Sequence, residues 1–334
     1  MKKSLTLLTL LVALSSCGGG GGGSTNLSSE NTTATSVTYL GAASQGDLAK
    51  FSLNGNSLTY EVQGPVFGDV KGNMTIQVNQ QKPFYKGEVN GTQVYMMLSG
   101  NIGFADVIIN GTDTLLVGLS NIGNLTDSEI AGKDFVYVEV LNTGEVGGYT
   151  IRLNSDHTWT MYDFSGNLED SGSWQMTSEN YVNATDSYGN TYHVIIKPGI
   201  SRAGFIVDLP NGFGIGLEQK ALTQNEITGT YSYYSYDVQY DEDCFGTVKV
   251  WYDNSTNTYK YLAKTIWCDD PADIGYEENG TLTPNSPVNG TLTLTDPQGN
   301  KGYIFLDPED GYFTGVGVDS NGYITDYMIG SNKY

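Results

Sequence analysis

The stretch LTDSEIAGKDF (residues 125–135) returns later in the chain as LTQNEITGTY (residues 222–231). Both copies read LTxxEIxG followed by an aromatic residue, and their leucines lie 97 residues apart. The residues before each copy also match, as Gly103-Phe104 with Asn110-Gly111 and as Gly204-Phe205 with Asn211-Gly212. A looser third copy, Gly311-Tyr312 with Asn321-Gly322, closes the chain. Repetition at this period indicates duplicated domains, because each copy is long enough to have its own core.

Division at these two linkers gives three modules, at residues 37–121, 127–220 and 226–334. Asn-Gly pairs recur throughout them, and this dipeptide supplies the positive φ angles that tight β-hairpins require. Between the turns lie short β-branched and aromatic runs with a period of two, such as Ser57–Val62 and Thr191–Ile196. No window has a convincing helical period. The sequence therefore predicts an all-β protein.

About eight strands in hairpin order are expected in each module. In the middle module they fall at about residues 135–141, 147–154, 157–163, 171–177, 180–186, 191–197, 203–209 and 212–218. Consecutive antiparallel strands leave two exposed edges, and closure into a barrel pairs both. We therefore prefer three tandem up-and-down barrels of the lipocalin or avidin type over β-sandwiches. The motifs Asn154-Ser-Asp-His-Thr-Trp159 and Ser171-Gly-Ser-Trp174 also resemble strands of small lipocalin-like lipoprotein domains, which implies a calycin-type barrel.

The N-terminal residues have the three regions of a secretory signal. Met1-Lys2-Lys3 is basic, and Leu5–Leu14 is apolar but too short to span a bilayer. Leu14-Ser15-Ser16-Cys17 resembles the lipobox of bacterial lipoproteins, whose cysteine is acylated and becomes the new N-terminus. The resemblance implies a signal peptide at residues 1–16 and a lipid anchor, carrying palmitate, on Cys17. The alternative is an ordinary cleaved signal with an incidental cysteine.

The segment after the cysteine has the composition of a tether. Residues 17–36 contain six consecutive glycines followed by Ser, Thr and Asn, so this segment has little to bury and is expected to stay flexible. A cysteine followed by a glycine tract resembles Gram-negative surface lipoprotein antigens such as the transferrin-binding and heparin-binding antigens. The resemblance implies anchoring to the cell envelope through Cys17, most simply at the outer membrane, with exposure at the cell surface or in the periplasm.

Composition excludes several functions. The net charge is −21 at pH 7, which disfavours DNA, RNA and anionic lipid as partners. The chain has no GxSxG elbow, HExxH motif or phosphate loop, and only two histidines, His157 and His193. Both histidines lie in turn or strand sequences, where a structural hydrogen bond is the simplest role. We therefore expect no enzyme, and a hydrolase remains the minor alternative.

A tyrosine-rich run opens the third module. In TYSYYSYDVQY (residues 230–240), strand alternation puts Tyr234, Tyr236 and Tyr240 on one face and Tyr231 and Tyr233 on the other. Tyrosine rings on both faces suit a ligand-binding surface, because they offer large contact area at a low cost in rotamer entropy. The alternative is that they fill a barrel and pack across strands.

One hairpin of the third module has a register that can be read from its turn. Pairing about residue 256 sets Trp251 opposite Tyr261, Phe245 opposite Trp267, and Cys244 opposite Cys268. Cysteines that face each other in this way predict a disulfide, which an oxidising compartment allows. The same register gathers carboxylates that are candidate Ca²⁺ ligands, namely Asp241, Glu242, Asp243, Asp269 and Asp270. No other cofactor is expected.

Two hypotheses of function follow. The first is a non-catalytic envelope lipoprotein whose β-modules bind a protein, a glycan or a small ligand. The second is a structural or envelope-assembly lipoprotein with no soluble ligand. The anchor, the tether and the serial modules favour the first hypothesis.

Cys17→Ser tests the anchor, because it replaces only the sulfur that would carry the lipid. We expect the variant to move from the detergent phase to the aqueous phase on Triton X-114 partition and to incorporate no labelled palmitate. Ser24→Ala, seven positions further along, is the control and should partition like the parent chain. Equal partition of Cys17→Ser and the parent would contradict lipidation at this residue.

Overall fold

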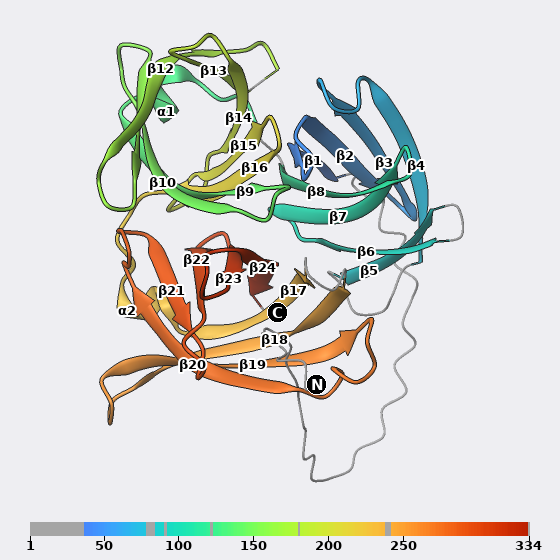
Figure 1. The fold of residues 1–334 in the computed structure, drawn as a ribbon, viewed down its shortest axis with the longest axis vertical. Helices are drawn as coiled ribbons and strands as arrows, with labels where there is room; N and C mark the ends of the chain where they lie inside the picture. Colours follow the sequence, from blue (N-terminus) through green and yellow to red (C-terminus); the bar gives the residue numbers. More distant parts are fainter. Residues whose placement is uncertain are drawn as a thin grey trace, which may run out of the picture.

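The computed structural model describes residues 37–77, 84–89, 92–120, 123–179, 181–237 and 242–332. Cys17 and the tether lie outside these residues, as do Tyr240 and Asp241. The described chain forms three closed eight-stranded antiparallel barrels, in which each strand pairs with its neighbours in sequence and the last pairs with the first. Figure 1 shows the barrels as blue-green, green and orange-red groups arranged around a common centre. The predicted all-β class and the preference for barrels are confirmed.

The first barrel consists of β1 (Val37–Ala43), β2 (Leu48–Asn54), β3 (Ser57–Gln63), β4 (Val70–Gln77), β5 (Phe84–Val89), β6 (Thr92–Leu98), β7 (Ile102–Ile109) and β8 (Thr112–Ser120). The second consists of β9 (Lys133–Leu141), β10 (Val146–Leu153), β11 (Thr158–Asp163), β12 (Leu168–Met176), β13 (Val182–Asp186), β14 (Thr191–Lys197), β15 (Gly204–Leu209) and β16 (Gly212–Glu218). The third consists of β17 (Gly229–Asp237), β18 (Glu242–Asp253), β19 (Thr258–Cys268), β20 (Glu277–Pro284), β21 (Thr291–Thr295), β22 (Lys301–Asp307), β23 (Tyr312–Val318) and β24 (Ile324–Asn332).

The repeated linker plugs a barrel. It contains a single helical turn in each copy, α1 (Asp127–Ile130) and α2 (Gln224–Ile227). The Thr and Glu of LTxxE form a capping box, in which Glu129 accepts the backbone N–H of Thr126 at 2.7 Å, and the second copy repeats this contact at 2.6 Å. The Leu and Ile of the repeat are buried in the core of the barrel that follows, Leu125 and Ile130 in the second and Leu222 and Ile227 in the third. The linker therefore covers one end of each of these two barrels, where Figure 1 places α1 and α2.

Alternation along the strands sorts the apolar side chains into two sets. One set points into the lumen, and each barrel has its own interior cluster. The other set points outward on the strands that face the centre of the molecule. There it forms a fourth cluster shared by all three barrels, which includes Phe104 of β7, Val138 of β9 and Tyr234 of β17. Each module thus has its own core, as the repeat predicts, but the barrels are also packed against one another.

Aromatic and polar contacts join the barrels across this junction. Tyr95 of the first barrel lies 4.4 Å from Trp267 of the third, between ring centroids. The Asn101 side chain of the first barrel donates to the Asp310 carbonyl of the third at 2.6 Å and accepts from Lys197 of the second. The first barrel therefore makes directional contacts with both of the others. No helix in the described part of the chain is long and apolar enough to cross a membrane.

Val138→Asp tests the shared cluster, because it buries an unpaired charge between barrels while the lumen of the second barrel is unchanged. Val138 is fully buried on the outward face of β9. We expect the free energy of unfolding in urea to fall by about 3 kcal/mol or more. Gln175→Asp, on an exposed position of the same barrel, should change it by less than about 0.5 kcal/mol. Equal effects of the two substitutions would show that the barrels are not packed together.

Candidate functional sites in the barrel lumens

The second barrel encloses a cavity of about 270 Å³ at the end of its lumen opposite α1. The lining side chains are mostly aromatic and aliphatic, with two carboxylates among them: Tyr137, Ile151, Trp159, Tyr192, Val194, Phe205, Glu139 and Asp170. The α1 end has no such space, because Leu125, Ile130 and Trp174 pack there with the other core residues. The cavity extends towards the β9–β10 and β15–β16 turns, where Leu141, Leu209 and Pro210 line it.

Two glycines, one on each strand next to β9, help to keep this space open. Gly147 and Gly214 pair with Glu139 on either side, so neither neighbouring strand contributes a side chain at that level of the lumen. A Cβ on Gly214 would lie 2.7 Å from the Tyr137 ring, and one on Gly147 would lie 2.5 Å from the Tyr149 ring. A larger residue at Gly214 would therefore displace the Tyr137 ring, which lines the cavity, and one at Gly147 would displace the Tyr149 ring.

Glu139 is the ionisable group best placed to contact a ligand. Its Oε1 accepts the Tyr137 hydroxyl at 3.2 Å, while burial raises the pKa of its carboxyl to about 7. Glu139 is therefore partly protonated near neutral pH and can either donate or accept a hydrogen bond. Glu139 was not among the site residues predicted from the sequence. The available signal was one acidic residue at an inward position of the apolar run Phe135–Leu141.

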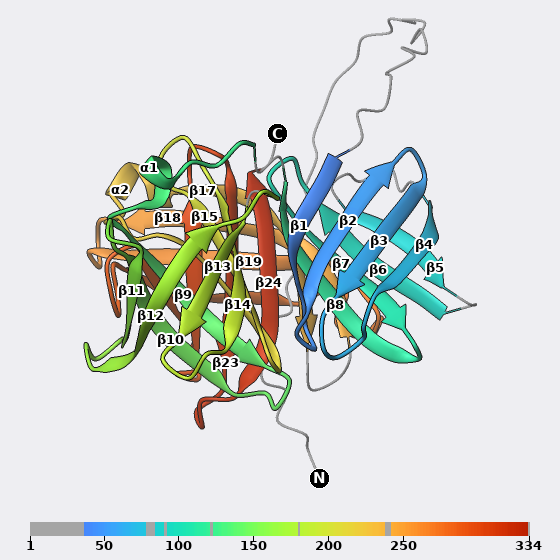
Figure 2. The same cartoon turned by 90° about the horizontal axis from the view of Figure 1, so that it is seen from above.

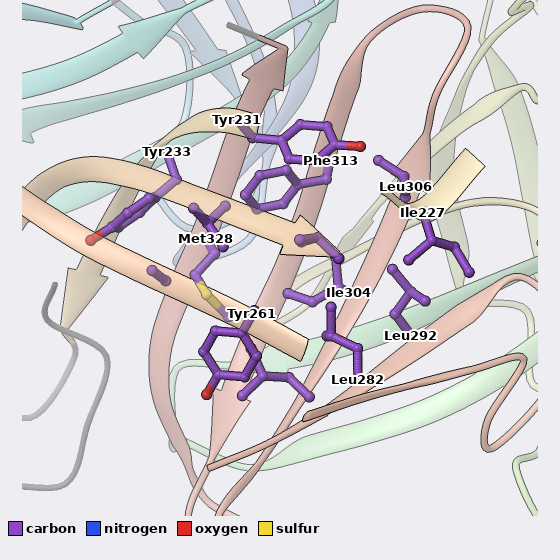
Figure 3. A pocket seen from close by; sticks show the side chains of 14 residues that line it. Ile227, Tyr231, Tyr233, Tyr261, Leu282, Leu292, Ile304, Leu306, Phe313 and Met328 are labelled. Atoms are coloured by element: carbon purple, nitrogen blue, oxygen red, sulfur yellow. The ribbon is translucent and has the colours of Figure 1, made fainter. Parts of the chain in front are cut away.

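The tyrosines of the third module divide between two environments, as alternation predicts. Tyr231 and Tyr233 point into the third lumen and line a second cavity of about 60 Å³, together with Tyr261 and Met328 (Figure 3). Tyr234 is fully buried in the shared cluster, where its ring meets that of Phe104 edge-on at 6.3 Å. Tyr236 is partly buried and stacks on Tyr327 at 6.2 Å. Ligand binding by these residues stays a prediction.

Cys244 and Cys268 face each other across β18 and β19 and are joined by a disulfide. Phe245 pairs with Trp267, as the turn-centred register predicts. The predicted pairing of Trp251 with Tyr261 is wrong, because Trp251 faces Lys260. A register shift between Phe245 and Gly246 leaves Ile266 as an extra residue on β19, so one register does not extend over the whole hairpin.

The predicted calcium ligands are engaged mainly with their own loop. Glu242 Oε1 accepts the Asp270 backbone N–H at 2.8 Å, and Asp269 Oδ2 accepts that of Asp243 at 3.3 Å. The Tyr234 hydroxyl donates to Asp243. Among the described residues, only Glu242, Cys244 and Cys268 bring three potential ligand atoms within 4.8 Å of one another, and both sulfurs are in the disulfide. Calcium binding stays a prediction, and it depends in part on Asp241.

Both histidines have structural partners. His157 stacks on Trp174 at 4.5 Å, and its Nε2 lies 3.5 Å from Asp127. His193 Nδ1 lies 2.6 Å from Asp208, a hydrogen bond that raises the pKa of the imidazole. In the described part of the chain, neither histidine hydrogen-bonds to a serine, threonine or cysteine side chain. A histidine-activated nucleophile is therefore not assembled among these residues.

Comparison with known proteins assigns no family. No family model matches the chain, and no curated protein matches its sequence. Among solved structures, a protein of unknown function from the DUF3598 family of Nostoc punctiforme is similar over 62% of this chain and 97% of its own, with 10% identity and a TM-score of 0.27. The vaccine antigen transferrin binding protein B of Haemophilus parasuis is similar over 89% and 76%, with 7% identity and a TM-score of 0.23. That of Neisseria meningitidis is similar over 86% and 66%, with 10% identity and a TM-score of 0.27. Likenesses at this level assign no function to the chain.

Glu139 gives the free energy of unfolding a pH dependence of defined sign. Because folding raises the pKa of its carboxyl, the folded state binds more protons than the unfolded state up to about pH 7, so stability falls as the pH rises towards that value. Glu139→Gln removes the ionisable carboxyl, and with it this loss of unfolding free energy at higher pH. From pH 5 to pH 8, we expect the free energy of unfolding of the variant to rise by about 1–2 kcal/mol relative to that of the parent. This is less than the full pKa difference implies, because the carboxyl is partly exposed.

Urea unfolding at the two pH values measures this gain. Glu145→Gln, on the exposed turn of the same hairpin, is the control and should show no pH-dependent difference from the parent. A pH-independent effect of Glu139→Gln would mean that the carboxyl is not held in a buried environment.

Proposed function

We propose that the chain is a non-catalytic, lipid-anchored envelope protein that binds a small apolar ligand in the lumen of its second barrel. The cavity of about 270 Å³ carries this proposal. An apolar cavity of about 150 Å³ in another protein is enough to bind benzene, so this lumen has room for a ligand of two or more rings. The surrounding strands are closed by hydrogen bonds, which makes the cavity a preformed one.

The lining supports an apolar ligand with a single polar group. Tyr137, Trp159 and Phe205 offer ring faces, and Glu139 at the open end can accept one hydrogen bond. The lipobox-like sequence at Cys17 and the glycine tract support the anchor. A coil of about 19 residues reaches roughly 25 Å, so the barrels would stand clear of the lipid headgroups.

Binding of N-phenyl-1-naphthylamine tests the lumen, because this neutral fluorescent probe has two apolar ring systems and one N–H donor. The chain without its first 23 residues keeps every described residue and is used throughout. We expect saturable fluorescence enhancement with one site per chain. Ala184→Leu fills the cavity of the second barrel and should weaken binding at least tenfold.

Ala263→Leu is the matched control, because it adds the same atoms to the lumen of the third barrel. It should leave the probe affinity unchanged. Absence of saturable binding, or equal weakening by the two substitutions, would contradict a ligand site in the second barrel and would favour a structural envelope protein instead.

A further inference from the structure

The third lumen has two chemically different ends. Towards α2 it is apolar and forms the cavity of about 60 Å³, with Ile227, Leu292 and Leu306 at that end (Figure 3). At the opposite end, five acidic residues occupy strand positions whose side chains face the lumen. They are Asp237 of β17, Glu242 of β18, Glu278 of β20, Asp296 just after β21 and Asp326 of β24. Tyr233 and Tyr261 lie between the two ends, with their hydroxyls directed away from Ile227 (Figure 3).

Two of these carboxylates are buried with an oxygen that has no protein partner. Glu278 is 3% exposed and Asp326 is 2% exposed. Glu278 Oε1 accepts the Tyr261 hydroxyl, but Glu278 Oε2 and Asp326 Oδ2 are buried without any hydrogen bond. Burial together with the charges of Asp237 and Glu278 raises the pKa of Asp326 well above its ordinary value, and burial raises that of Glu278 to about 7. An unpaired buried carboxylate oxygen is costly, and a bound cation would remove that cost.

The described residues of the third barrel supply no cation to this end of the lumen. Its described lysines, Lys249, Lys260, Lys264 and Lys301, all occupy outward positions of their strands. Lys264, the most buried of them, pairs at 2.8 Å with Glu277, the exposed neighbour of Glu278. Among the described residues, no lysine or arginine pairs with Glu278 or Asp326.

The spacing of these carboxylates disfavours a single metal ion. In the described part of the chain no three acidic residues bring one oxygen each within 4.8 Å of one another, and Ca²⁺ binds six to eight oxygens at 2.3–2.6 Å. A planar cation with several N–H donors can bridge groups that are further apart, because a guanidinium presents five donors in a fixed fork.

We propose that the third lumen binds an alkylguanidinium, with the guanidinium between Glu278 and Asp326 and a short alkyl stem in the apolar cavity. The rings of Tyr233 and Tyr261 line the apolar cavity, and the Tyr261 hydroxyl reaches Glu278, so these rings lie between the two parts and can stack on the planar cation. Two inward glycines make room for those rings, since a Cβ on Gly246 or Gly280 would lie 2.6 Å from the Tyr233 or Tyr261 ring. This site is separate from the cavity of the second barrel.

Isothermal titration of the chain without its first 23 residues, with n-butylguanidinium and n-butylurea, tests the proposal. The two probes have the same shape, but only the first is charged. We expect saturable binding of n-butylguanidinium at one site and at least tenfold weaker binding of n-butylurea. The double variant Glu278→Gln, Asp326→Asn should lose at least tenfold in n-butylguanidinium affinity.

Folding of the double variant is checked by its thermal melt, which we expect at or above that of the parent because the amides remove buried negative charge. Glu277→Gln, the outward neighbour on the same strand, is the matched control and should bind n-butylguanidinium like the parent. Equal affinity for the two probes, undiminished binding by a folded double variant, or no binding of n-butylguanidinium would overturn the proposal. So would competition by millimolar Ca²⁺ with one-to-one displacement, since it would assign the carboxylates to a metal.

Discussion

The alternation of side chains along closed strands is the constraint on which the rest of the structure depends. Because every strand is paired on both edges, each residue faces either the lumen or the outside. The lumen positions produce three interior clusters, and the outward positions on the central strands produce the shared one. The neighbouring residues Tyr233 and Tyr234 therefore lie in different environments: Tyr233 lines the third lumen, and Tyr234 packs between the barrels.

The repeated linker and the junction together determine where the lumens open. α1 and α2 fill one end of the second and third barrels, and they lie on the same side of the molecule (Figure 2). At the opposite ends, the Ile324 N–H of the third barrel donates to the Gly144 carbonyl of the second at 2.9 Å. A smaller cavity of about 120 Å³, lined by residues of all three barrels including Gln45, Asn142 and Tyr236, lies near these turns. The cavity of the second lumen and this smaller cavity are thus neighbours, since Leu141 lines both.

Much of the fold could be predicted because hairpin turns and a period of two are local signals. The strands expected in the middle module lie close to β9–β16, and the two faces of the tyrosine run are those observed. Three features were not predictable in the same way. The bulge at Ile266 depends on how β19 fits its neighbours. The shared cluster depends on which outward faces of the three barrels pack together, and the pattern of a single strand does not determine this. The unpaired oxygens of Glu278 and Asp326 arise because closure of the barrel buries two residues that are 48 positions apart in the sequence. The helical turn in LTxxE, in contrast, had a readable capping-box signal.

The second lumen, on which the proposed function depends, is filled at the linker end and open at the other. Thiol accessibility in the chain from residue 24, whose two native cysteines are joined, tests this arrangement most directly. A single Glu139→Cys variant places a thiol at the open end of the second lumen, and Ile130→Cys places one in the plug. The account predicts rapid labelling of the first by a small maleimide and labelling of the second only in urea. Rapid labelling of Ile130→Cys in the folded chain, with protection of Glu139→Cys, would contradict it.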